Sequence, residues 1–173
     1  MCIRDRIAMI QCYYGNGKGK TTAAVGQALR MAGADKKVLF LQFLKDGDSS
    51  EIKMLKKCGI KVLYAKMPQM FIDMHDPEMI KLVSRLEDEL FEQIDESYEG
   101  IVLDEILDAI ALNLLNEGKV YDCLVSLKET HEVILTGRQP SHKLKPILDY
   151  SSEIKKHKHP YDKGIKARKG IEF

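Results

Sequence analysis

The feature that most constrains the fold is a glycine- and lysine-rich segment, Gly15 to Thr22, which reads GNGKGKTT. It follows an apolar, β-prone run, Ile7 to Tyr14, and precedes a segment of helical composition, Thr22 to Gly33. Glycines let backbone N–H groups converge without obstruction by Cβ, and a helix that begins there adds the positive end of its dipole. A strand, a glycine loop and a helix in this order are typical of a loop that binds phosphate.

The loop departs from the usual pattern G-x-x-x-x-G-K-[ST], which would place a glycine where this chain has Tyr14. Lys20 and Thr21 keep the positions from which an ammonium contacts phosphate and a hydroxyl ligates Mg²⁺. A glycine-rich turn with exposed lysines is the alternative. The residues that we expect to contact nucleotide are Gly15, Asn16, Gly17, Lys18, Gly19, Lys20, Thr21 and Thr22.

Strand and helix patterns alternate along the rest of the chain. Apolar runs predict further strands at 37–44, 60–66, 100–104 and 132–136. Helical periodicity or composition predicts helices at 50–58, 77–98, 106–116 and 120–130, and a helix candidate at 141–150 that is broken near Pro146. This alternation predicts an α/β domain of the three-layer, P-loop NTPase-like (RecA-like) kind, with a mainly parallel sheet between two layers of helices.

Two predicted strands end in residues suited to a nucleotide site. Asp104 and Glu105 follow the apolar run 101–103, as at the acidic strand end that holds Mg²⁺ beside a phosphate loop. Arg138 follows another strand and would face the same edge of the sheet, where it could contact phosphate. Each signal is common by itself, and a purely structural role is the alternative for each. With Lys20 and Thr21 they predict Mg-nucleotide binding, with Thr21, Asp104 and Glu105 as metal ligands.

Composition excludes several other classes of protein. The chain has 173 residues, 27 basic and 26 acidic side chains and a net charge of +1, which fits one domain and argues against a coat for nucleic acid or an anionic membrane. No apolar run approaches the roughly 18 residues of a membrane span. The four cysteines lie far apart without a CxxC pair, which indicates a reduced, cytoplasmic protein.

We expect the first six residues of the chain to differ from the rest in origin. Residues 1–6, MCIRDR, look like read-through of a sequencing adapter, so we expect a non-native leader and a single domain over 7–173.

Residues 151–173 hold seven bases and three acids, a net charge of +4. A solvated terminus and a segment that closes on the site are both compatible with this charge. Nucleic-acid binding is not favoured, because the tail lacks interleaved aromatic residues.

Together these segments resemble a family, the P-loop corrinoid adenosyltransferases. The resemblance covers 7–173 in order and rests on GNGKGKTTAAVGQALR, VLFLQFLK, VLDEI, ILTGR and the ending KHPYDKGIKARKGIEF. The ending is the most specific part, because generic P-loop proteins lack it. The resemblance implies transfer of the 5′-deoxyadenosyl group of ATP to the cobalt(I) of a reduced corrinoid, with release of triphosphate, in cobalamin biosynthesis or salvage.

The resemblance also implies roles for particular residues. Lys20 and Arg138 would act in catalysis by stabilising the triphosphate. Arg30 matches a family arginine and is a candidate for nucleotide contact, with a surface salt bridge on the helix as the alternative. Met70 and Phe71 stand where the family places bulky apolar residues against the corrin, although this chain has no tryptophan there; core packing is their alternative role. The resemblance further implies a flavin-type reductase that supplies electrons, and a homodimer.

Two other functions stay open at the level of the sequence. A P-loop kinase or ATPase would need a group that positions a hydroxyl or water, for which Glu105 is the candidate. A non-catalytic nucleotide-binding module would bind ATP tightly without chemistry. The products formed from ATP distinguish these alternatives from adenosyl transfer.

Overall fold

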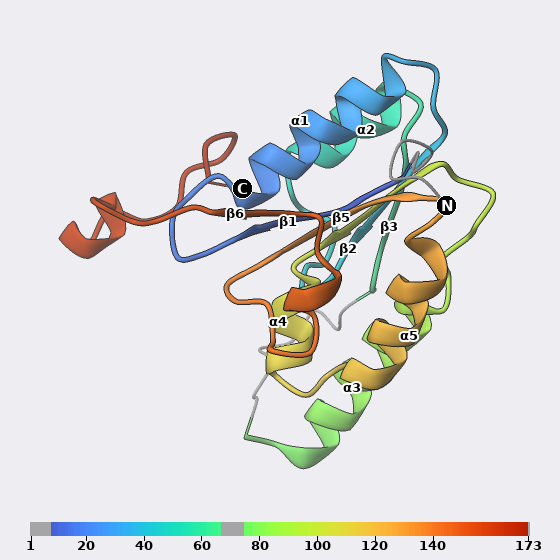
Figure 1. Cartoon of the computed structure of the whole chain (residues 1–173). Coiled ribbons are helices and arrows are strands. Elements are labelled where there is room, and N and C mark those ends of the chain that lie inside the picture. The colour runs from blue at the N-terminus through green and yellow to red at the C-terminus, as the bar shows by residue number, and fades with distance from the viewer. Residues whose placement is uncertain (1–7, 67–74, 173) are drawn as a thin grey trace.

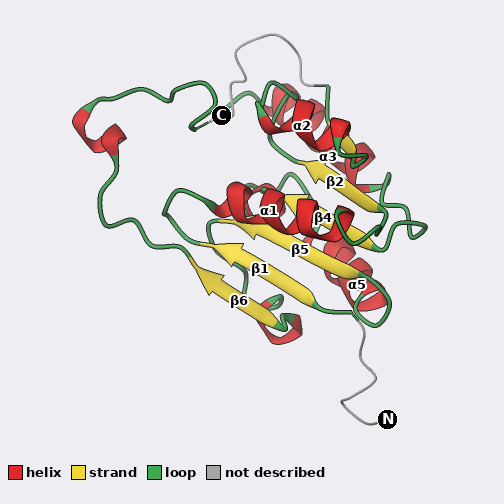
Figure 2. Ribbon diagram, turned by 90° about the horizontal axis from the view of Figure 1, so that it is seen from above, coloured by secondary structure: helices red, strands yellow, loops and turns green. Residues whose placement is uncertain are grey.

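The described residues of the computed structural model, 8–66 and 75–172, form one sheet of six parallel strands between two layers of helices (Figure 1). The strand order is β3-β2-β4-β5-β1-β6, visible from above in Figure 2. The strands are β1 (Ile10–Tyr14), β2 (Val38–Gln42), β3 (Lys61–Tyr64), β4 (Gly100–Asp104), β5 (Glu132–Gly137) and β6 (Tyr150–Glu153).

Helices cover both faces of the sheet. One layer consists of α1 (Lys20–Ala32) and α2 (Glu51–Lys57). The other consists of α3 (Pro77–Phe91), α4 (Ile106–Ala111) and α5 (Glu117–Leu127). The predicted three-layer α/β fold is therefore confirmed. Strand β5 separates β1, which leads into the glycine loop, from β4, which ends in Asp104.

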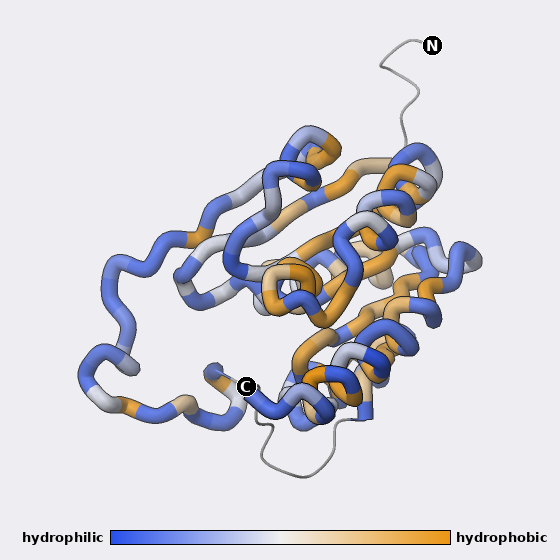
Figure 3. Tube along the Cα trace, turned by 90° about the horizontal axis from the view of Figure 1, so that it is seen from below, coloured by the Kyte–Doolittle hydropathy of each residue, from blue (hydrophilic) through white to orange (hydrophobic). Residues whose placement is uncertain are grey.

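Alternation along the buried strands builds a core on each face of the sheet. Leu39 and Leu41 of β2 pack in the core beneath α3, α4 and α5, whereas Phe40 between them packs beneath α1 and α2. Successive strand residues point to opposite faces, so a strand covered on both sides must be apolar throughout. Small side chains on α1, Ala24 and Ala28, are fully buried there and let the helix lie close to the sheet. Figure 3 shows the apolar trace concentrated in the strands.

The last predicted helix is wrong. Residues 141–149 contain only a short 3-10 turn, η2 (Lys145–Ile147), and the unpredicted strand β6 begins at Tyr150. Pro146 lacks the N–H that a helix interior needs. The four residues of β6, YSSE, are exposed and pair with one neighbour, β1, so they carry none of the apolar signal of a buried strand. The helices at 77–98 and 106–116 also end earlier than predicted, at Phe91 and Ala111.

Beyond β6 the chain arcs away from the sheet and returns toward the start of α1 (Figure 2). This segment contains a second 3-10 turn, η3 (Pro160–Lys163), and its residues are mostly exposed. None of the described helices is both long and apolar enough to span a bilayer.

Candidate functional site

The glycine loop joins β1 to α1 at the carboxyl edge of the sheet. Gly15 and Gly19 have φ of 120° and 119°, a region that L side chains rarely adopt, and Gly19 directly precedes the helix. The N-terminal N–H groups of α1 therefore open onto the loop without a side-chain cap. This is the backbone arrangement that binds anions at a helix N-terminus.

Strand β6 and the residues after it close one side of this loop. The Gly17 N–H donates to the carbonyl of Ile154 at 2.8 Å, and the Lys156 N–H donates to the side-chain oxygen of Asn16 at 2.8 Å. A Cβ on Gly17 would lie 2.8 Å from the Ile154 carbonyl oxygen, and one on Gly15 would meet the same group. The glycine displaced from position 14 to position 15 is thus required by the backbone of the neighbouring segment.

Asp104 connects four elements at the site. It ends β4, is fully buried, and accepts hydrogen bonds on both carboxylate oxygens. Oδ1 accepts from the hydroxyls of Thr21 (2.9 Å) and Thr136 (2.7 Å). Oδ2 accepts from Nε2 of Gln42 (3.3 Å) and Nζ of Lys45 (2.9 Å). A buried carboxylate needs such donors, and these fix the hydroxyl of Thr21 at the start of α1.

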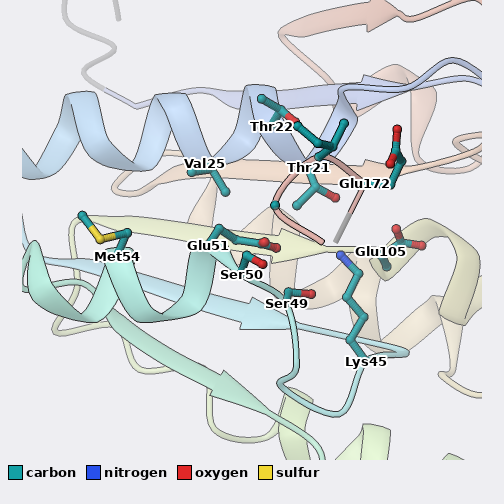
Figure 4. A pocket seen from close by; sticks show the side chains of 12 residues that line it. Thr21, Thr22, Val25, Lys45, Ser49, Ser50, Glu51, Met54, Glu105 and Glu172 are labelled. Carbon is teal, nitrogen blue, oxygen red and sulfur yellow. The ribbon is translucent and has the colours of Figure 1, made fainter. Parts of the chain in front are cut away.

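Glu105 follows in a strained conformation that turns the chain from β4 into α4. Its φ is 65°, and its N–H donates to the hydroxyl of Thr136 at 2.8 Å. Burial, and then repulsion from the neighbouring Asp104, raise the pKa of the Glu105 carboxyl. The side chain of Glu105 faces the cleft that Figure 4 shows. Glu105 is therefore the acid that lines the cleft, whereas Asp104 is fully buried beside it.

Two adjoining clefts open above these residues. A cleft of about 440 Å³ runs along the glycine loop and reaches Arg138, and one of about 520 Å³ lies between α1 and the start of α2 (Figure 4). Both volumes fall in the range of small-ligand sites. The residues that line both clefts are Thr21, Thr22, Glu105, Ile171 and Glu172. The two clefts together could hold an elongated ligand such as a nucleoside triphosphate.

The two predicted catalytic cations line the loop cleft. Nζ of Lys20 donates to the carbonyl of Gly17 at 3.0 Å, so its ammonium lies over the loop. The Arg138 side chain is 83% exposed, and its Nε lies 3.9 Å from a carboxylate oxygen of Asp108. Such an open ion pair contributes little and leaves the guanidinium available to a phosphate.

Of the other predicted residues, Arg30 is not brought to the loop. Arg30 lies exposed in the last turn of α1, about 15 Å along the helix axis from Lys20 at 1.5 Å per residue. Its nucleotide role stays a prediction. Met70 and Phe71 lie outside the described residues.

The tail places an acid, rather than one of its many bases, in the site. The Glu172 side chain lines both clefts and is paired with Arg168, whose guanidinium NH2 lies 3.0 Å from its Oε1. Hydrogen bonds from the Arg168 side chain and backbone lower the pKa of Glu172 to about 2. Glu172 is therefore ionised wherever the protein is folded at ordinary pH.

Sequence reasoning missed several residues of the site. Gln42 and Lys45 belong to the run VLFLQFLK and lie at the carboxyl end of its strand. Ligands of parallel sheets bind at the carboxyl ends of the strands, so this position was the available signal. Thr136 lies within the quoted ILTGR, where its hydroxyl was available as a signal. Glu172 had no local signal, because only the path of the tail brings it back to the loop.

The oxygen atoms of Thr21, Asp104 and Glu105 are the hard ligands that Mg²⁺ prefers. Asp104 already accepts four hydrogen bonds, so it would support the ion through Thr21 rather than expose a bare carboxylate. Within 8–66 and 75–172 no group of three His, Cys, Asp or Glu side chains could hold a metal ion. The donor set fits an ion that arrives with phosphate oxygens and water.

The parallel sheet, the glycine loop and the buried acid at the end of β4 define a P-loop nucleotide-binding protein. Residues 6–173 match the model of the family described as ATP:corrinoid adenosyltransferase BtuR/CobO/CobP. The chain therefore belongs to the ATP:corrinoid adenosyltransferase family, as its resemblance predicted.

Individual relatives agree with this assignment. The chain is 32% identical to the corrinoid adenosyltransferase of Escherichia coli K12 and 30% identical to corrinoid adenosyltransferase CobA of Salmonella typhimurium LT2. Each match covers 98% of this chain and 88% of the relative. The corrinoid adenosyltransferase of Pseudomonas aeruginosa PAO1 is 28% identical over 98% of this chain and 86% of its own length.

Proposed function

We propose that this chain transfers the 5′-deoxyadenosyl group of ATP to the cobalt(I) of a reduced corrinoid and releases triphosphate. The observation that carries the proposal is the phosphate loop beside buried Asp104 in a chain of the ATP:corrinoid adenosyltransferase family. The electron pair of cobalt(I) forms the bond to C5′, and the pair of the broken C5′–O bond leaves with the triphosphate. Such a step belongs to cobalamin biosynthesis or salvage.

The residues of the site suit this reaction because cobalt(I) is itself a strong nucleophile. The protein needs to align the ATP and stabilise the charge that develops on the triphosphate. Lys18, Lys20 and Arg138 line the loop cleft and supply positive charge, together with the N-terminus of α1. Lys20 has only to exchange the Gly17 carbonyl for a phosphate oxygen.

Mg²⁺ would be held by the Thr21 hydroxyl and the Glu105 carboxylate, with Asp104 orienting Thr21. When bound, the ion supplies charge neutralisation to the triphosphate. The residues of the chain do the rest: the loop N–H groups orient the phosphates, and Asp104 keeps the Thr21 hydroxyl at the cleft.

The remaining components are proposals of the same kind. We expect the segment 151–173 to close over bound ATP, because Gly170, Ile171 and Glu172 already line the cleft. We expect Met70 and Phe71 to contact the corrin, a flavin-type reductase to deliver electrons in the cytoplasm, and two copies of the chain to form a homodimer.

A product assay tests the function directly. The protein is incubated with ATP, Mg²⁺ and chemically reduced corrinoid, and the light-sensitive cobalt–carbon product and triphosphate are both quantified. Equal amounts of the two products are expected. ADP or inorganic phosphate without alkylated corrinoid would indicate a kinase or ATPase instead, and tight ATP binding without turnover would indicate a binding module.

A further inference from the structure

Lys45 is a lysine of the cleft that lies outside the phosphate loop. It follows β2 at the carboxyl edge of the sheet, and its Nζ lies 2.9 Å from Oδ2 of Asp104. Figure 4 shows its side chain rising toward the space between Thr21 and Glu105. The Lys45 side chain is 26% exposed, whereas that of Asp104 is fully buried. Lys45 thus joins the buried acid to the open cleft.

The turn that presents Lys45 is held in an unfavourable conformation. The preceding residue, Leu44, has φ of 56°, which costs a non-glycine residue on the order of 1 kcal/mol. Its N–H donates at 2.9 Å to Oε1 of Glu87, a fully buried carboxylic side chain on α3. On the other side, the Phe43 N–H donates to the carbonyl of Asp104 at 3.0 Å. Two elements therefore fix the direction in which Lys45 leaves the sheet.

Asp104 does not depend on Lys45 for its hydrogen bonds. Three other side chains, Thr21, Thr136 and Gln42, donate to its two oxygens. An ammonium has three N–H donors, and within the described part of the chain one of those of Lys45 has a hydrogen-bond partner, Asp104. Two donors of Lys45 can therefore serve a ligand in the cleft while the contact with Asp104 persists.

The acidic side chains that line the cleft indicate a role for the two remaining N–H donors of Lys45. Glu51, Glu105 and Glu172 all line the cleft that Lys45 faces, and they would repel a triphosphate. The lysines of the phosphate loop line the adjoining cleft, on the other side of Glu105. Lys45 is the lysine that lines the α1–α2 cleft within the described residues.

We propose that Lys45 is a further phosphate-binding lysine, outside the phosphate loop, which donates to a triphosphate oxygen while it remains paired with Asp104. The proposal rests on the proposed function, because it assumes that a triphosphate occupies these clefts. The competing explanation is a positioning role, in which Lys45 only neutralises Asp104 and so keeps Thr21 in place.

Binding measurements without corrinoid test the proposal on the full chain. Isothermal titration with inorganic triphosphate and with ATP, each with Mg²⁺, compares the wild type with Lys45→Met, Lys45→Gln and Lys45→Arg. We expect the two neutral variants to bind both ligands about tenfold or more weakly, the loss of one charge-assisted hydrogen bond. Arginine should restore part of the affinity. The matched control is Lys81→Met, a 73% exposed lysine on α3, which should bind like the wild type.

A second background separates direct contact from positioning. In Asp104→Asn protein there is no buried charge for Lys45 to neutralise, so a direct phosphate contact predicts that Lys45→Gln still weakens triphosphate binding about tenfold. Loss of the effect in this background, or unchanged affinity in the single variants, overturns the proposal. Thermal unfolding confirms that each variant is folded. If the wild type binds triphosphate but forms no alkylated corrinoid, the proposed function is contradicted. The Lys45 proposal is still tested in that case, because it depends only on the triphosphate affinities of the wild type and the Lys45 variants.

Discussion

At the scale of the residue, Asp104 and the groups around it organise the site. One buried carboxylate receives donors from α1, from the end of β5, from β2 and from the loop after β2. Each of these donors belongs to a residue that lines the cleft, or to a residue that contacts one lining the cleft. We therefore expect substitutions near Asp104 to lower both stability and ATP binding, and substitutions at the cleft surface to lower ATP binding alone.

Lys20→Ala is a substitution at the surface of the cleft. Its ammonium touches the loop carbonyl of Gly17 and no core residue, so its loss should leave the fold intact. We expect adenosyl transfer to fall at least about 100-fold, the usual effect of removing one group that stabilises developing charge. Product assays and thermal unfolding are compared with Lys36→Ala, a control far from the cleft. Unchanged turnover would contradict the assignment of Lys20.

Glu87 predicts a pH dependence of stability. Burial raises the pKa of its carboxyl from 4.5 to about 7, so the folded state holds the proton more tightly than the unfolded chain. Its stabilising contribution is complete below about pH 4.5, declines as the pH rises and is lost above about pH 7; the loss is about 3 kcal/mol by order of magnitude. Denaturant unfolding should therefore show that the free energy of unfolding declines less between pH 5 and 8 for Glu87→Gln than for the wild type. The same pH dependence for both proteins would contradict this.

At the scale of the element, the residue directly after β6, Ile154, packs against the glycine loop. The Ile154 carbonyl accepts from Gly17, and its approach leaves no space for a Cβ at either Gly15 or Gly17. The loop glycines thus serve the neighbouring strand as well as the phosphate. An edge strand of polar residues, which the hydrophobic pattern does not reveal, pairs with β1 and so brings Ile154 against the loop.

Two glycine substitutions on adjoining elements test this packing. Gly17→Ala places a Cβ 2.8 Å from both the carbonyl oxygen and a methyl of Ile154, so we expect a loss of about 1–3 kcal/mol and weaker ATP binding. Gly26→Ala, exposed on α1 with no neighbour within 4 Å, should stabilise by about 0.5–1 kcal/mol. Denaturant unfolding measures both. Equal stability of the two variants would show that β6 does not restrict the loop.

At the scale of the whole molecule, we expect the tail to be the part whose arrangement depends on ligand. From residue 155 onward its residues are mostly exposed, and the chain curls back at its end (Figure 3). There Ile171 and Glu172 line both clefts. Few contacts hold the intervening arc, so it should open readily. A triphosphate in the loop cleft would attract its lysines and favour closure.

Limited proteolysis tests that closure. Trypsin should cut at exposed tail lysines such as Lys158, Lys163 and Lys166, and cutting should slow several-fold with saturating ATP and Mg²⁺. Cleavage after Lys36, in an exposed turn remote from the cleft, serves as the internal control. Mass spectrometry identifies the sites. Tail cleavage that proceeds at the same rate when ATP is bound would contradict closure.

The sequence by itself determined the fold class, the phosphate loop and the family, because each depends on residues close together in the chain. Strand β2 was predictable since a strand buried on both faces must be apolar, and Asp104 was predictable because it ends such a strand. Only the tertiary structure decided that Lys45 meets Asp104, that Ile154 closes the loop and that Glu172 enters the cleft. The contacts of Lys45 with Asp104 and of Ile154 with the loop join residues separated by 59 or more positions, and no local pattern shows which distant residue each of them meets.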